Sequence, residues 1–150
     1  MIKFRAWGRD GNHPGTPSEK LEMFYDVSVV TTYQDGEQHV IADFGMYNES
    51  EYSGTEIIDY TLMQSTGLFD KNGVEIFEGD IVKSCRLVNG HIYEYVGQVK
   101  FVDFGWNIVD KKHTYDPFYN YTDGYPDEIW EIEVIGNIYE NLDLLERVEE

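Results

Sequence analysis

The side chains best suited to metal or acid–base chemistry are the four histidines, at His13, His39, His91 and His113. None belongs to an H-x-H or H-E-x-x-H pattern, the spacings that bring two imidazoles to one metal ion. The best local group is His113 with Asp110 and Asp116. Such a group is more typical of a solvated loop than of a metal centre, so we expect no metal site.

Nucleophile and phosphate-binding motifs are also missing from the sequence. It contains no G-x-S-x-G, no G-x-x-x-x-G-K-[ST] and no G-x-G-x-x-G. The single cysteine, Cys85, lies in strand-like sequence, and a lone cysteine is usually a small buried residue. It cannot form an internal disulfide, which suits a reducing compartment. We therefore expect a protein that is not an enzyme and that needs no cofactor.

Three carboxylates near apolar residues are candidates for acid–base groups. Glu131 and Glu133 alternate with apolar residues, which predicts a shared solvent face. Asp103, in the segment VDFGW, lies at a strand end beside aromatic residues. A turn-stabilising role is the more typical one for Asp103, because an aspartate there can bind its own backbone turn.

A tyrosine-rich segment near residue 120 is the strongest binding candidate. Tyrosines give rigid, amphipathic contact area, and protein interfaces are enriched in them. The alternative is a lid that covers an open edge of the sheet with its own aromatic side chains. The candidate contact residues are Tyr115, Phe118, Tyr119, Tyr121 and Tyr125.

The charge is strongly negative, with 29 acidic against 11 basic residues and a net charge of −18. This charge repels nucleic-acid backbones and anionic lipids within about 8–10 Å, so generic nucleic-acid and membrane binding are disfavoured. The acidic excess either serves solubility alone or attracts a basic partner, in the extreme case by imitating nucleic acid.

Alternating apolar and polar residues dominate the chain, which predicts a mainly β fold. At the N-terminus, Ile2, Phe4 and Ala6 share one face of an extended segment, with Lys3 and Arg5 on the other. We expect one compact domain over 1–150, with a β subdomain at 1–62 and a small meander that curls into a barrel at 63–150. The other expected elements are a loop at 8–20, strands at 22–33, 37–44, 81–88, 91–104 and 129–139, and a short helix at 141–150. Asp35-Gly36 predicts a hairpin between the first two strands, and residues 55–69 fit a strand or a short helix, of which the strand is favoured.

Residues 65–82, STGLFDKNGVEIFEGDIV, pack three glycines and two turn signals into strand-like sequence. Asn72-Gly73 suits the positive φ of a hairpin turn, and Glu78-Gly79-Asp80 suits a reversal into the strand that begins at Ile81. The segment is therefore predicted to form two corners of the fold.

The same segment, read with KFRAW at 3–7 and IEVIGNIYENLDLL at 132–145, resembles the YopX family of small phage and prophage proteins. The phrase T-G-L-x-D-x-N-G-x-x-I-x-E-G-D-I-V is the family's hallmark. The signature residues taken from this resemblance are Gly67, Asp70, Asn72, Gly73, Glu78, Gly79, Asp80, Gly136 and Asn137. The resemblance implies a mainly β fold whose C-terminal half is a small SH3-like barrel. It implies no established activity, so no catalytic residue carries over.

We therefore expect a phage or prophage accessory protein in the bacterial cytoplasm, acting by protein–protein contact as a homo-oligomer, without membrane association. Three alternatives remain: an acidic nucleic-acid mimic that sequesters a basic host protein, a metal-dependent hydrolase, and a structural part of the virion.

Overall fold

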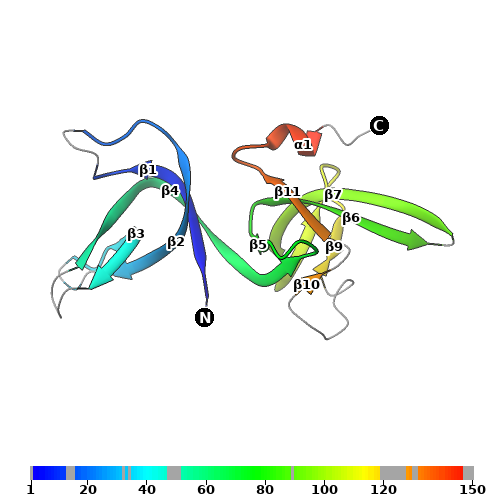
Figure 1. The fold of residues 1–150 in the computed structure, drawn as a ribbon, viewed down its shortest axis with the longest axis horizontal. Coiled ribbons are helices and arrows are strands. Elements are labelled where there is room, and N and C mark those ends of the chain that lie inside the picture. Colours follow the sequence, from blue (N-terminus) through cyan, green and yellow to red (C-terminus); the bar gives the residue numbers. More distant parts are fainter. Residues whose placement is uncertain are drawn as a thin grey trace. The chain divides into compact units, whose positions relative to one another are not determined.

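The computed structural model describes residues 2–12, 16–31, 33, 35–46, 52–88, 90–118, 128–129 and 132–146 (Figure 1). The strands are β1 (Phe4–Asp10), β2 (Glu22–Thr31), β3 (Gln38–Met46), β4 (Tyr52–Asp70), β5 (Glu75–Phe77), β6 (Asp80–Val88), β7 (His91–Val102), β8 (Gly105–Val109), β9 (Tyr115–Pro117), β10 (Glu128–Ile129) and β11 (Ile132–Asn137). One short helix, α1 (Leu142–Glu146), follows them. The expected mainly β fold with a short C-terminal helix is confirmed, and residues 55–69 lie in a strand.

The chain divides into two compact units, Met1–Gln64 and Ser65–Glu150, and the division falls within β4. Each unit has its own apolar core. In the first unit the buried core residues are Ala6, Val27, Val40, Ala42 and Ile57. In the second they are Ile76, Val82, Val99, Ile108, Phe118 and Ile132.

The first unit is a ring of four antiparallel strands. β1 pairs with both β2 and β4, while β3 pairs with β2 on one side and β4 on the other. Ile57 pairs with Val40 of β3 and with Asp10 of β1, and its side chain is buried. The ring thereby encloses the first core.

Three of the strands in this ring bulge at an aspartate. Asp26, Asp43 and Asp59 have φ of 55°, 55° and 48°, and each lies where the register of a strand pair shifts. Aspartate is one of the few residues other than glycine that adopts positive φ readily. A bulge bends its strand, which allows four strands to close on themselves.

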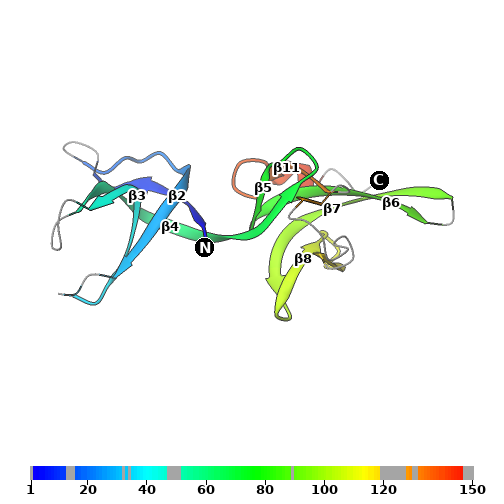
Figure 2. The same ribbon diagram turned by 60° about the horizontal axis from the view of Figure 1, so that its bottom comes forward.

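The second unit contains a five-stranded antiparallel sheet in the order β11-β6-β7-β8-β9. β6 and β7 form a long hairpin, and β7 pairs with β8 only from Gln98 onward (Figure 2). β5 pairs with β4, and β10 adds two residues parallel to β4, at Phe69 and Asp70. The sheet packs its inner face on the second core.

Three local expectations are corrected by the structure. Arg5 is only 2% exposed; it lies in β1, which has β2 on one side and β4 on the other, and the ring of Tyr25 lies 5.9 Å from its guanidinium. Cys85 is exposed rather than buried, because it lies just past Ser84, the last residue of β6 that pairs with β11. The predicted loop at 8–20 is shorter, because β1 continues to Asp10 along β4.

Among the described residues, no helix has the length and apolar character needed to cross a membrane.

Candidate functional site

The carboxylate of Asp70 organises the first corner of the signature segment. Asp70 is fully buried, and its Oδ1 accepts hydrogen bonds from the backbone N–H groups of Asn72 and Val74, both at 2.8 Å. Its Oδ2 accepts the N–H of Val134 in β11, also at 2.8 Å. Gly73 completes the turn by donating its N–H to the carbonyl of Asp70 at 3.0 Å. One carboxylate therefore shapes the β4–β5 turn and holds β11 against it.

The three glycines of the signature segment have a backbone conformation that only glycine adopts easily. Gly67, Gly73 and Gly79 have φ of 78°, 78° and 88°. Gly79 donates its N–H to the carbonyl of Val99 at 2.9 Å and accepts the N–H of Ile138 at 3.0 Å. This residue thus joins β7 to the segment after β11, in a conformation that is strained for residues with a Cβ.

Asp80, which follows that glycine, is also buried, at 2% exposure. Its Oδ2 accepts the backbone N–H of Phe77 at 2.8 Å. This hydrogen bond closes the turn that contains Glu78, which is half-buried. Like the carboxylate of Asp70, the carboxylate of Asp80 accepts a hydrogen bond from the backbone.

Gly136 and Asn137 belong to a third hydrogen-bonded turn, which precedes α1. A Cβ on Gly136 would lie 2.6 Å from Oδ1 of Asn141, so a larger residue would displace that side chain. Asn141 uses this oxygen to accept the N–H of Asn137 at 3.2 Å. Asn137 Oδ1 in turn accepts the N–H groups of Tyr139 and Glu140, at 3.0 and 2.9 Å. All of these interactions fix the path of the chain.

The tyrosine-rich segment is only partly described. Tyr115 is 51% exposed. The expectation for Phe118 is corrected, because its side chain is 4% exposed and packs in the second core. Tyr119, Tyr121 and Tyr125 lie outside the described residues.

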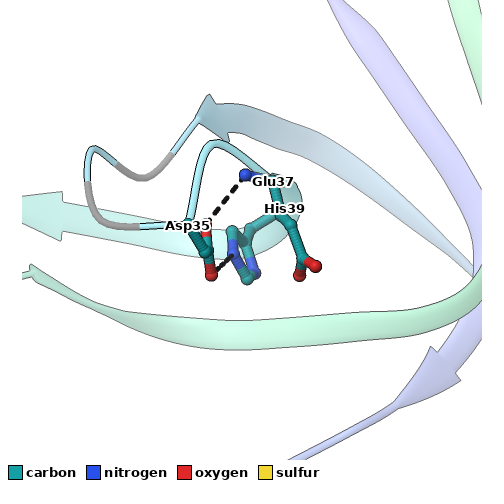
Figure 3. A group of neighbouring side chains, drawn as sticks. All are labelled: Asp35, Glu37 and His39. Carbon is teal, nitrogen blue, oxygen red and sulfur yellow. Dashed lines mark hydrogen bonds and ion pairs between the residues drawn. The ribbon is translucent and has the colours of Figure 1, made fainter.

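The structure brings together an acidic group around His39 that the sequence analysis missed. One ligand atom each from Asp35, Glu37 and His39 lie within 4.8 Å of one another (Figure 3). His39 Nδ1 lies 3.2 Å from Oε2 of Glu56 on β4, and its Nε2 lies 3.7 Å from Oδ2 of Asp35. The alternating spacing D-G-E-Q-H at 35–39, at the start of a strand, was the available signal.

The electrostatics of this group favour a proton on His39. The hydrogen bond to Glu56, with the charges of Glu56 and Asp35, raises the pKa of His39 above 6.5, against a smaller opposing effect of burial. A protonated imidazole pairs with carboxylates and does not ligate a metal. The arrangement is therefore best suited to an ion-paired link between the β2–β3 turn, β3 and β4.

The residues around His113, which were the best local candidates for metal ligands, form part of a hydrogen-bonded turn. Oδ1 of Asp110 accepts the N–H groups of Lys112 and Thr114, at 3.0 and 2.7 Å. His113 is exposed and has φ of 62°, while Asp116 is buried. Within the described parts of the chain, these residues do not gather as potential metal ligands.

Tyr95 braces the same turn from β7. Its hydroxyl donates to the carbonyl of Thr114 at 2.5 Å and accepts the N–H of Asp110 at 3.2 Å. Burial, aided by the charge of Asp110, raises the pKa of Tyr95 to about 12. The hydroxyl therefore keeps its proton at neutral pH and acts as a structural hydrogen-bonding group.

The β7–β8 hairpin presents the most exposed aromatic side chain among the described residues of the second unit. Asp103 and Phe104 form its two-residue turn, with φ of 51° and 63°, and Phe104 is 98% exposed. Beside the turn, the rings of Phe101 and Trp106 meet edge to face at 5.1 Å. Asn107 donates from Nδ2 to the carbonyls on both sides of the turn, at 3.1 and 3.2 Å. The predicted turn position of Asp103 agrees with this geometry. The exposure of Phe104 was not predicted from the sequence.

The chain is similar to a protein family and to solved structures of bacterial proteins. The sequence model of the family described as YopX protein matches residues 3–146. Protein EF1440 from Enterococcus faecalis is 30% identical, with a TM-score of 0.55, over 97% of this chain and 98% of that one. Protein yopX from Bacillus subtilis is 22% identical, with a TM-score of 0.53, over 98% of both chains. No curated protein matches the chain significantly.

Proposed function

This chain belongs to the YopX protein family, and from that premise we propose that it is a phage or prophage accessory protein that works by protein–protein contact rather than by catalysis. The proposed location is the cytoplasm of the bacterial host. Both self-association and contact with a basic host protein are part of this proposal.

Exposed aromatic side chains are the observation that carries it. Phe101 in β7 and Tyr115 in β9 are 56% and 51% exposed, and Phe104 in the turn between β7 and β8 is 98% exposed. Large exposed aromatic groups are unfavourable in water and are enriched at protein interfaces. They support a contact surface on this part of the second unit.

The polar signature residues support a structural rather than a chemical role for the motif. Asp70 and Asp80 use carboxylate oxygens to accept backbone N–H groups, and Asn137 does the same with its amide oxygen. A carboxylate engaged in this way is poorly placed to exchange protons or to take up a ligand. The signature therefore supports the fold on which a contact surface stands.

The acidic balance favours a basic partner. With a net charge of −18, the chain attracts cationic surfaces over about a Debye length. The stronger form of this idea is that the protein imitates nucleic acid and sequesters a nucleic-acid-binding protein of the host.

We also propose that the sheet of the second unit curls into a small SH3-like barrel. Ile132 of the edge strand β11 and Phe118, next to the opposite edge strand β9, pack in one core cluster. Side chains from both edges meet in this way when a sheet curls on itself.

Affinity capture from host lysate, at low and at high salt, tests the proposed mode of action. A basic host partner held by charge should be recovered at low salt and lost at about 0.5–1 M salt, because salt screens exposed charges. A partner held by aromatic contacts should persist at high salt. Recovery of no protein under either condition, from a chain that is also monomeric, would contradict the proposal.

A further inference from the structure

Asn72-Gly73, at the tip of the first corner of the signature segment, is a pair of residues that is prone to spontaneous chemical change. Asparagine is a thermolabile residue, because the backbone nitrogen that follows it can attack the carbonyl carbon of its side chain. Glycine allows the closest approach, since it has no side chain to obstruct the attack. Asn72 and Gly73 are both exposed, so water reaches them. Residue 72 is therefore a candidate for deamidation.

The reaction needs no reagent besides water. The nitrogen of Gly73 loses its proton and forms a bond to Cγ of Asn72, while the bond from Cγ to the amide nitrogen breaks and ammonia leaves. Water then opens the cyclic imide at either of its carbonyl carbons. One product is aspartate. The other is isoaspartate, in which the main chain runs through the former side chain and gains a methylene carbon.

The hydrogen bonds of the corner oppose this reaction. Gly73 donates its N–H to the carbonyl of Asp70 at 3.0 Å. The N–H groups on either side of it, those of Asn72 and Val74, both donate to Oδ1 of Asp70 at 2.8 Å. To reach Cγ of Asn72, the Gly73 nitrogen must lose its proton and its peptide group must rotate, which breaks these bonds. The nearby carboxylate charge also disfavours a second negative charge on the amide.

We propose that residue 72 is a deamidation site that Asp70 keeps closed in the folded protein and that becomes reactive when the corner opens. Asp70 is a positioning residue here, because it fixes the backbone and takes no part in the bond changes. Lys71 also holds the corner closed: its N–H donates to the carbonyl of Ile132 at 3.0 Å, and its Nζ lies 3.1 Å from Oε2 of Glu133. The fraction of molecules with an open corner therefore sets the rate of deamidation.

Isoaspartate at residue 72 prevents the corner from closing again. Asp70 donates its N–H to the carbonyl of Val74 at 2.8 Å, and the added methylene lengthens the chain between these two residues. The turn then no longer fits the carboxylate of Asp70, whose Oδ2 accepts the N–H of Val134 in β11. The reaction thus makes a transient opening of the second unit permanent, and it requires neither an enzyme nor a partner.

Peptide mapping by mass spectrometry tests the proposal on the purified full chain, kept at mildly alkaline pH in buffer and in urea. Deamidation of Asn72 should be at least about tenfold slower in buffer, because only molecules with an open corner react. The pair Asn89-Gly90 provides an internal reference. In urea both pairs should react at similar rates, since the local sequence alone then sets the rate.

Asp70→Asn tests the positioning role. This variant lacks the charge and presents an amide that cannot satisfy all three N–H groups, so Asn72 should react roughly tenfold faster in buffer than in the wild type. Asp80→Asn is the matched control, because the carboxylate of Asp80 is also buried but binds the N–H of Phe77 at the second corner. Its rate at Asn72 should stay within about twofold of the wild type.

Equal rates at Asn72 for the wild type in buffer and in urea would overturn the proposal, and this comparison decides alone if Asp70→Asn does not fold. A folded Asp70→Asn variant that reacts no faster than Asp80→Asn would overturn it as well. Wild-type chains that have formed isoaspartate should melt at a lower temperature than unreacted chains. An unchanged melting temperature would contradict the loss of closure.

Discussion

Asp70 illustrates how a motif carboxylate can serve structure alone. Its two oxygens accept three backbone N–H groups, two in its own turn and one in β11. Hydrogen bonds to a charged acceptor contribute more than neutral ones, and buried donors that lose their acceptor are costly. The residue is therefore expected to dominate the stability of the second unit.

Replacing Asp70 tests this role. Asp70→Ala should lower the free energy of unfolding by about 3 kcal/mol or more, because it leaves three N–H groups in a buried turn without their acceptor. Asp103→Asn, at an exposed turn position where asparagine is equally tolerated, should change it by less than about 0.5 kcal/mol. Urea unfolding measures both variants, and similar values for the two would refute the structural role of Asp70.

At His39 the structure predicts a pH dependence of stability. Because Glu56 and Asp35 raise the pKa of His39, the folded protein binds this proton more tightly than the unfolded chain does. The resulting stabilisation is fully present below the unfolded value of 6.5 and is lost as the pH rises through the higher folded value.

The melting temperatures of wild type and His39→Gln should therefore differ most below pH 6.5 and converge once the pH has risen above the raised pKa of His39 in the folded protein. Glu56→Gln should remove most of this pH dependence, because Glu56 is its principal cause. A difference between wild type and His39→Gln that stays constant from acid to alkaline pH would show that the ion pair does not contribute.

At the scale of the elements, the bulged aspartates account for the closure of the first ring. Asp43 is exposed and has φ of 55°, so its backbone rather than its packing is what matters. Asp43→Gly should leave stability unchanged or raise it slightly, whereas Asp43→Val should lower it by about 1–2 kcal/mol, because a β-branched residue tolerates positive φ poorly. Thermal unfolding of both variants checks the prediction, and equal effects would contradict it.

The signature corners allow the same comparison with glycine. Gly79→Val should lower stability by about 2 kcal/mol or more, since φ is 88° and the backbone on both sides is hydrogen-bonded. Gly73→Val should cost less, because a Cβ at Gly73 meets nothing within 4 Å and only the strain at φ of 78° remains. The order of the two melting temperatures is the observable, and unchanged values in both would refute the account.

Much of the element pattern could be predicted because it depends on local signals. Alternation identified the strands, and Asn72-Gly73 with Gly79 identified turns that the φ values bear out. The burial of Arg5 and the exposure of Cys85 could not be predicted, because they depend on which strands lie beside β1 and on where β11 ends. The His39 group was missed for the same reason, since Glu56 comes from a different strand.

At the scale of the whole molecule, buried signature residues hold the fold together. The exposed aromatic side chains are the surface that we propose for contact. Asp70 and Asp80 belong to the first group, and Phe104 to the second. The alternation that predicts the strands does not predict the positive φ of Phe104. The conformation of a turn residue is set by the register of the two strands that meet there.

Native mass spectrometry of the tagged chain, purified from bacterial cells that express it, tests this account most directly. The account predicts a mass of more than one chain, or of the chain with a second protein, at low micromolar concentration. A spectrum that shows a single chain alone would contradict it.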